Sequence, residues 1–151
     1  MTQPSIRTGR LTREDLDDVG ALFHRHTGRP ADLDIIGAWI DGWPCVGAWT
    51  GGPLAGFLLC KSFAPDVGEI ANLLVAPELR DRGIGGALLA CAESLAVEQG
   101  ITGMVGVTSI AYDVVGPKRL ASPFYVRHGY RVVLETAHTH VFARTLGETA
   151  A

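Results

Sequence analysis

The sequence of 151 residues has few cysteines, no long hydrophobic run and no excess of basic residues. Its three cysteines, Cys45, Cys60 and Cys91, are odd in number and lack C-x-x-C spacing. They indicate neither a disulfide framework nor a zinc ribbon, and we expect them to be buried thiols. No apolar run approaches the roughly 18 residues of a membrane span, and residues 1–5 lack the pattern of a signal peptide. These absences favour a cytoplasmic protein without a membrane partner.

The formal net charge of −3 argues against nucleic acid as a partner, because nucleic-acid-binding domains are usually basic. Acidic residues are concentrated in the first third of the chain, at Glu14, Asp15, Asp17, Asp18, Asp32, Asp34 and Asp41. Basic residues flank a glycine-rich turn and a later loop, at Arg80, Arg82, Lys118 and Arg119. One end of the molecule then suits a cation and the other an anion, with solvated helix faces as the alternative for the acidic group.

Length and composition predict one globular domain. Apolar residues make up 47% of the chain and charged residues 19%, which excludes disorder for most of its length. A domain of about 150 residues buries about 68–70% of its unfolded surface and needs no cross-links. We assign residues 1–147 to this domain and residues 148–151 to a loose C-terminal tail.

Hydrophobic periodicity and turn residues predict an α/β fold with a mixed sheet. Strands are expected at 5–8, 46–49, 54–63, 68–75, 101–107, 130–136 and 138–143. Helices are expected after the N-caps Thr12 and Asp32, at 83–99 and at 118–128. The order is therefore β-α-α-β-β-β-α-β-α-β-β.

Two of these elements show clear burial patterns. The helix at 83–99 has an apolar stripe at Ile84, Leu88, Cys91, Ala92 and Leu95. The strand at 68–75 is almost continuously apolar from residue 70, which predicts a central position covered on both faces.

The most informative segment is residues 75–86, which joins that strand to that helix with the sequence Val-Ala-Pro-Glu-Leu-Arg-Asp-Arg-Gly-Ile-Gly-Gly. Proline ends the strand, and the glycines leave the amides of the first helical turn unobstructed. The helix dipole places about half a positive charge there, and Arg80 and Arg82 add two full charges. The segment therefore predicts a diphosphate site, with a plain strand-to-helix turn as the alternative.

The same segment disfavours two common phosphate sites. A Walker loop needs Gly-Lys-Ser or Gly-Lys-Thr, and neither lysine nor a hydroxyl residue directly follows Gly86. The dinucleotide-binding fingerprint needs a third small residue at the position of Leu88. Nucleoside triphosphates and dinucleotides are therefore poor candidates.

The run Arg80-Asp81-Arg82-Gly83-Ile84-Gly85 instead resembles the Arg/Gln-x-x-Gly-x-Gly/Ala motif of the GNAT superfamily of N-acetyltransferases. The predicted order of elements is also that of the GNAT fold, so the resemblance covers nearly the whole chain. It implies acetyl-CoA as co-substrate. The coenzyme contacts that it implies are Leu73, Leu74, Val75, Arg80, Asp81, Arg82, Gly83, Ile84, Gly85, Gly86 and Lys118. The first three would act through backbone groups, on a strand that splays from its neighbour.

A second segment, residues 118–130, is similar to the late GNAT helix, whose pattern is Asn-x-x-Ala-x-x-x-Tyr-x-x-x-Gly-Phe. Ala121, Tyr125 and Gly129 match, Tyr130 replaces the phenylalanine, and Lys118 replaces the asparagine, where its ammonium suits a phosphate. The resemblance implies that Tyr125 donates a proton to the leaving coenzyme A thiolate. A tyrosine packed in the core is the alternative. Pro123 removes a backbone donor, so the helix is expected to begin near that residue.

Glu69 is the candidate general base. It lies eleven residues before Arg80, at the start of the strand at 68–75, a position resembling that of the glutamate base in one branch of the family. An alkylamine with a pKa near 10.4 is almost wholly protonated at neutral pH, so a base or a water chain helps. A solvent-facing glutamate at a strand end is the alternative.

The histidine pairs are weak metal signals, and no metal is expected. His138 and His140 are predicted on one face of a strand, and His24 and His26 share the same spacing, but neither pair has a third ligand.

Two expectations concern partners. Trp39, Trp43 and the acidic group favour a small amine or a cationic peptide terminus as acceptor. The segment 141–143 is expected to provide an edge for a possible homodimer.

The sequence therefore predicts an acetyl-CoA-dependent N-acetyltransferase that acts by direct transfer in a ternary complex. A non-catalytic acyl-CoA-binding module remains open, as does transfer of another acyl group or transfer to a hydroxyl, because a fold does not fix a function.

Overall fold

The structure is a computed structural model that describes residues 5–109 and 121–147. Lys118 and the tail at 148–151 lie outside the described residues, and so does Arg119. The strands are β1 (Arg7–Arg10), β2 (Val46–Trp49), β3 (Leu54–Ala64), β4 (Val67–Val75), β5 (Gly103–Ser109), β6 (Arg131–Glu135) and β7 (Thr139–Thr145). The helices are α1 (Leu16–Thr27), α2 (Leu33–Gly42), α3 (Ile84–Glu98) and α4 (Ser122–Arg127), with short 3-10 turns at Arg13–Asp15 and Pro77–Leu79. The predicted α/β class and the predicted order of elements are confirmed.

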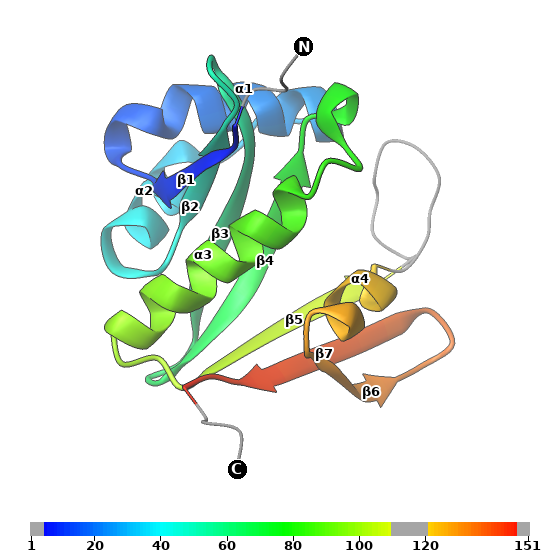
Figure 1. The fold of residues 1–151 in the computed structure, drawn as a ribbon. Coiled ribbons are helices and arrows are strands. Elements are labelled where there is room, and N and C mark those ends of the chain that lie inside the picture. The colour runs from blue at the N-terminus through cyan, green and yellow to red at the C-terminus, as the bar shows by residue number, and fades with distance from the viewer. Residues whose placement is uncertain (1–4, 110–120, 148–151) are drawn as a thin grey trace.

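The described strands form one seven-stranded sheet in the order β1-β2-β3-β4-β5-β7-β6. Neighbouring strands are antiparallel except β4 and β5, which are parallel. Helices α1 and α2 cover one face, and α3 and α4 cover the other (Figure 1). Each face has its own hydrophobic core, which we call the α1/α2 core and the α3/α4 core.

The helix boundaries follow the local signals in the sequence. Thr12 and Asp15 form the predicted capping box, in which the Thr12 amide donates to Asp15 Oδ2 at 2.8 Å. Asp32 caps α2 by accepting from the Ile35 amide at 3.1 Å. Gly100 ends α3 with a φ of 80°, a conformation that costs glycine little.

The buried stripe of α3 differs from the predicted one. Ile84, Leu88 and Ala92 are buried as expected, but Leu89 and Ala96 replace the other two positions, and Cys91 is only half-buried. Helix α4 packs beside the first turn of α3, at Gly85 and Gly86, and Leu89 and Ala96 belong to the same α3/α4 core. Cys45 and Cys60 are buried as predicted, and burial raises their pKa values to about 11 and about 12.

Strand β4 is central, as predicted, but residues 71–73 are only half-buried. Its pairing with β5 runs only from Val67 to Ile70 and from Gly103 to Gly106. Beyond that point β4 remains paired with β3 and β5 remains paired with β7, so β4 and β5 diverge (Figure 1). A bulge at Ala71, which has no partner on β3, marks where the divergence begins.

The expected edge at 141–143 is wrong. Strand β7 pairs with β5 along its whole length and with β6 on its other side, so β6 is the edge strand. Strand β7 occupies all the pairing positions that β5 offers on that side, so β6 pairs only with β7. His138 precedes β7, so the predicted pairing of the two histidine rings on one strand face does not occur.

The contact between β5 and β7 predicts a stability test. A Cβ at Gly106 would overlap the Phe142 ring, which cannot retreat because it stacks on Tyr125. We expect Gly106→Ala to lower the free energy of unfolding by about 1–3 kcal/mol, measured by urea denaturation. Gly9→Ala is the control, since Gly9 also lies in a strand but has no atom within 4 Å of its Cβ position. Equal losses in the two variants would contradict this packing.

Candidate active site

The turn that enters α3 has the backbone of an anion site. Asp81 has a φ of 62° and Gly83 a φ of 79°, so the chain passes twice through the left-handed region within three residues. The first amide bonded within the helix is that of Ala87, which donates to Gly83 O at 3.0 Å. The amides of Ile84, Gly85 and Gly86 therefore point out of the helix end without helical acceptors.

Two arginines surround this turn. Arg80 and Arg82 are exposed, and Arg80 contacts His26 Nδ1 at the end of α1 at 3.3 Å. Burial, and secondarily the Arg80 guanidinium, lower the pKa of His26. Arg25 binds the Glu78 carboxylate at 2.8 Å, which also ties the turn to α1. Helix α1 thus holds the Arg80 side chain and the turn at Glu78 in place.

Gly85 and Gly86 also have a packing role that the sequence did not indicate. A Cβ on Gly85 would lie 3.4 Å from the Phe124 ring, and one on Gly86 would lie 2.9 Å from His128 Nε2. The Phe124 and His128 rings lie in contact with centroids 4.5 Å apart and planes tilted by 42°, and His128 Nδ1 also donates to Phe124 O. The glycines therefore let α4 lie directly against the first turn of α3.

The divergence of β4 from β5 frees backbone groups close to this turn. The Ala76 amide donates to Ala55 O on the β3 side at 2.8 Å. Because antiparallel bonding alternates, Leu74 also directs its polar backbone groups toward β3, whereas Leu73 and Val75 direct theirs toward the missing β5 neighbour. Of the three predicted backbone contacts, Leu73 and Val75 are thus the two that lie on the freed edge.

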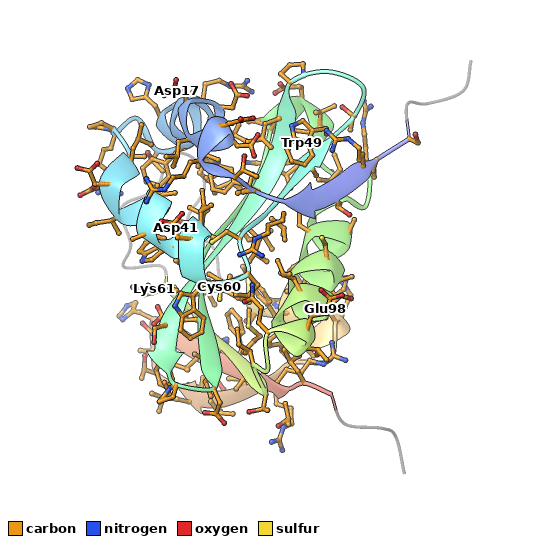
Figure 2. All side chains as sticks on the ribbon, turned by 90° about the vertical axis from the view of Figure 1, so that its left-hand side faces the viewer. Asp17, Asp41, Trp49, Cys60, Lys61 and Glu98 are labelled. Atoms are coloured by element: carbon orange, nitrogen blue, oxygen red, sulfur yellow. The ribbon has the colours of Figure 1, made fainter. Side chains whose placement is uncertain are left out.

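Glu69 lies on β4 just before the divergence, with 27% of its side chain exposed. Its Oε2 atom is 3.7 Å from Lys61 Nζ, on the neighbouring strand. Lys61 in turn lies 5.7 Å from the centre of the Trp39 ring on α2. Figure 2 shows Lys61 beneath the end of α2 that carries Asp41. Glu69 therefore faces the α1/α2 side of the sheet.

Tyr125 lies on the other side, in the α3/α4 core, and is 6% exposed. Its ring stacks on Phe142 with centroids 3.9 Å apart and an interplanar angle of 18°. Burial raises its pKa, which keeps the phenol protonated. In the described part of the chain no side-chain oxygen or nitrogen is both fully buried and unpartnered. Among the described residues, the Tyr125 hydroxyl is not a fully buried atom that lacks a hydrogen-bond partner.

The acidic group of the first third consists largely of structural and surface residues. Asp15 and Asp32 cap helices, and Asp41 binds Arg13 at 2.7 Å, which lowers the pKa of that carboxyl. Within residues 5–109 and 121–147, no three His, Cys, Asp or Glu side chains are grouped so as to hold a metal ion. These contacts fit the alternative interpretation of the acidic group, in which its residues belong to solvated helix faces.

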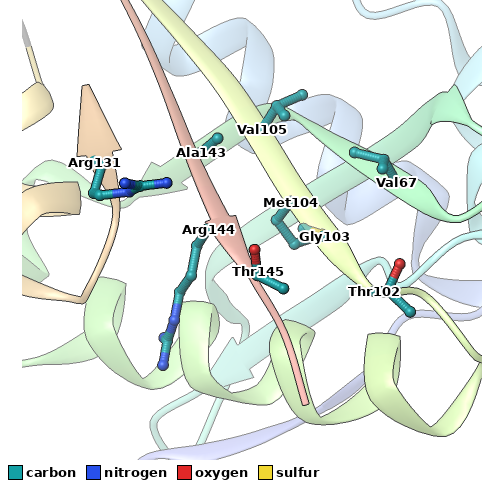
Figure 3. A pocket seen from close by; sticks show the side chains of 9 residues that line it. All are labelled: Val67, Thr102, Gly103, Met104, Val105, Arg131, Ala143, Arg144 and Thr145. Atoms are coloured by element: carbon teal, nitrogen blue, oxygen red, sulfur yellow. The ribbon is translucent and has the colours of Figure 1, made fainter. Parts of the chain in front are cut away.

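A hollow of about 350 Å³ lies elsewhere, at the paired end of β4 and β5 (Figure 3). Its lining is Val67, Thr102, Gly103, Met104, Val105, Arg131, Ala143, Arg144 and Thr145. None of the predicted site residues is among them. The candidate site is instead the opposite end of the sheet, where the freed edge of β4, the first turn of α3 and the helix α4 come together.

Similar folds occur among solved structures. The ribosomal-protein-S18-alanine N-acetyltransferase from Escherichia coli superposes with a TM-score of 0.75 at 14% identity, over 97% of each chain. YncA from Salmonella typhimurium, solved with acetyl-CoA, gives 0.72 at 17% identity, over 97% of each chain. PaiA N-acetyltransferase from Thermoplasma acidophilum, in complex with coenzyme A, gives 0.70 at 21% identity, over 93% of this chain and 99% of the other. At these identities the likeness establishes the fold.

A comparison with curated proteins finds no match. No helix in the described ranges is long and apolar enough to cross a membrane. The model of the acetyltransferase (GNAT) family matches residues 13–130, which include both predicted motifs and most of the sheet. This chain therefore belongs to the GNAT acetyltransferase family.

Proposed function

We propose that this protein transfers the acetyl group of acetyl-CoA to a primary amine by direct attack in a ternary complex. The observation that supports this best is the position of the unbonded amides at the start of α3. They lie beside the freed edge of β4 and beside α4, the helix that carries Tyr125. Family membership and the coenzyme complexes of two structural neighbours agree with it.

The coenzyme diphosphate would bind the amides of Ile84, Gly85 and Gly86, with Arg80 and Arg82 neutralising its charge. Asp81 and Gly83 would shape the turn through their left-handed backbone. The pantetheine arm would pair with the polar backbone groups of Leu73 and Val75, as an added strand does on a free edge. Lys118 remains a predicted phosphate contact.

In the proposed reaction the amine nitrogen bonds to the acetyl carbon as the carbon–sulfur bond breaks. Tyr125 gives its hydroxyl proton to the leaving coenzyme A sulfur as the carbon–sulfur bond breaks. Burial raises the pKa of Tyr125, so the phenol carries its proton before the reaction. Glu69 takes the amine proton, directly or through water. The amine and the coenzyme would approach from opposite faces of the sheet, because Glu69 and Tyr125 lie on opposite faces.

The acceptor that we propose is a small amine or a peptide terminus. One structural neighbour is named as an N-acetyltransferase of an alanine in a ribosomal protein, which supports the peptide option. The Lys61 ammonium already lies 3.7 Å from the Glu69 carboxylate in the proposed site. An acceptor amine must therefore share that carboxylate with Lys61 or displace the lysine from it. Thiol release from acetyl-CoA across a panel of amines and peptides tests the activity. Coenzyme binding without thiol release from any acceptor would favour a non-catalytic module.

The anion site predicts a pair of matched variants. Gly83 and Gly100 flank α3 with φ values of 79° and 80°, and neither has an atom within 4 Å of its Cβ position. Alanine at either position should therefore cost about 1–2 kcal/mol of stability. Only Gly83→Ala should weaken coenzyme A binding, by about tenfold in calorimetric titration, because only that residue aims the binding amides. Equal affinities for the two variants would remove the turn from the site.

The acid role predicts a second matched pair. Tyr125→Phe should lower kcat by about 10²–10⁴ while leaving coenzyme affinity unchanged, because it deletes only the proton donor. Tyr130 is a neighbouring buried tyrosine whose hydroxyl donates to Glu93 Oε2 at 2.8 Å, away from the proposed reaction centre. Tyr130→Phe should reduce stability and spare kcat. If Tyr125→Phe keeps full activity, Tyr125 is a packing residue.

The base role predicts a pH effect. Glu69→Gln should lower the rate near neutral pH, and the loss should shrink as rising pH deprotonates the amine without help. Coenzyme affinity should not change. Glu98→Gln, at the exposed end of α3, serves as the control (Figure 2). A parallel pH–rate profile for Glu69→Gln and wild type would exclude Glu69 as the base.

A further inference from the structure

Three side chains from separate elements form a hydrogen-bonded chain that begins on α4, the helix that carries Tyr125. Ser122 Oγ on α4 lies 2.7 Å from His140 Nδ1 on β7. His140 Nε2 lies 3.0 Å from Glu135 Oε1 on β6. Ser122 is 5% exposed and is the one buried polar residue among the described residues. We call this set the Ser–His–Glu chain.

The acceptor at one end fixes the direction of both hydrogen bonds. A carboxylate only accepts, so His140 Nε2 carries a hydrogen and donates it to Glu135. In the neutral ring Nδ1 is then an acceptor, and Ser122 donates to it. Each member holds the next in one orientation, from the exposed Glu135 to the buried Ser122.

The hydrogen bond between Ser122 and His140 and the stacking of Tyr125 on Phe142 both attach α4 to β7. Ser122 and Tyr125 are three residues apart and share a face of α4. His140 and Phe142 are two residues apart and share a face of β7. Ser122 therefore bonds to His140 while Tyr125 stacks on Phe142, one attachment beside the other.

A helix of six residues has little stability of its own, so its contacts with β7 and with the first turn of α3 determine where it lies. The Tyr125 ring stacks on Phe142 and meets Phe124 and Tyr130 edge-on, and these apolar contacts have little directional preference of their own. The hydrogen bond to His140 is directional and fixes the second point. Together the two attachments set the direction of the tyrosine hydroxyl.

We propose that the Ser–His–Glu chain is a positioning device that aims the Tyr125 hydroxyl at the leaving thiolate. The inference rests on the proposed function, in which Tyr125 is the acid. A displacement of about 1 Å from reactive geometry can cost up to about 10² in rate, so losing the directional attachment should be visible in kcat.

The same three residue types also form nucleophilic triads, in which the serine attacks the substrate. Here the serine is buried, which favours positioning over nucleophilic attack. Covalent labelling of Ser122 by a fluorophosphonate probe would overturn the positioning role.

The test is a double-mutant cycle with kcat, KM for acetyl-CoA and the melting temperature measured for each variant. We expect Ser122→Ala to lower kcat about tenfold with little change in KM. In a Tyr125→Phe background the same substitution should have no further effect, because there is no hydroxyl left to aim. Ser94→Ala, which removes an exposed serine hydroxyl from α3, should behave as wild type.

Glu135 provides an independent variant if loss of the buried serine prevents folding. Its side chain is 69% exposed, so substitution leaves the core intact. Glu135→Ala should lower kcat about threefold, and Glu135→Gln should restore it, because an amide oxygen also accepts from His140 Nε2. If Ser122→Ala or Glu135→Ala lowers kcat as much in the Tyr125→Phe background as in wild type, the inference is overturned and the proposed function still stands. Full activity of Tyr125→Phe alone would overturn the inference and the acid role of Tyr125, whereas only a lack of thiol release by the wild-type protein would overturn the proposed function.

Discussion

The parallel pairing of β4 with β5 lasts only four residues, and the arrangement of the site depends on where it stops. At that point Ala71 bulges out of the β3–β4 ladder, and β5 moves away from β4 together with β7, with which it pairs along all of its seven residues. Backbone groups of Leu73 and Val75 lose a strand partner as a result. In a sheet interior such groups need another partner, and an extended ligand can supply it.

The same divergence places the other parts of the site. The chain leaves β4 through the turn at 76–83 and enters α3, so the free helix amides lie next to the freed strand edge. Because β5 and β7 move away from β4, α4 can settle on Phe142 and against Gly85 and Gly86. The sheet thus separates a face with Glu69 from a face with Tyr125. For direct transfer between two substrates, this separation would give each substrate its own approach.

Local signals in the sequence predicted much of the fold and part of the site. The capping box at Thr12, the N-cap Asp32 and the glycine turn at 83–86 act through neighbouring residues, so they can be recognised in a short window. The edge assignment of 141–143, the half-buried Cys91 and the place of His140 could not be predicted in this way. They depend on which strand lies outside and on where α4 packs, and both are set by residues far apart in the chain. Gly85 and Gly86 illustrate the difference. Their free amides could be predicted from the local motif, but their contact with α4 could be recognised only from the structure.

The most direct test of this account is a titration of isotope-labelled protein with coenzyme A, followed by backbone amide chemical shifts. The account predicts that the largest changes occur at residues 83–86 and at Leu73 and Val75, on the freed edge of β4. Changes centred on the hollow around Thr102 and Arg131, or no change at saturating coenzyme, would contradict it.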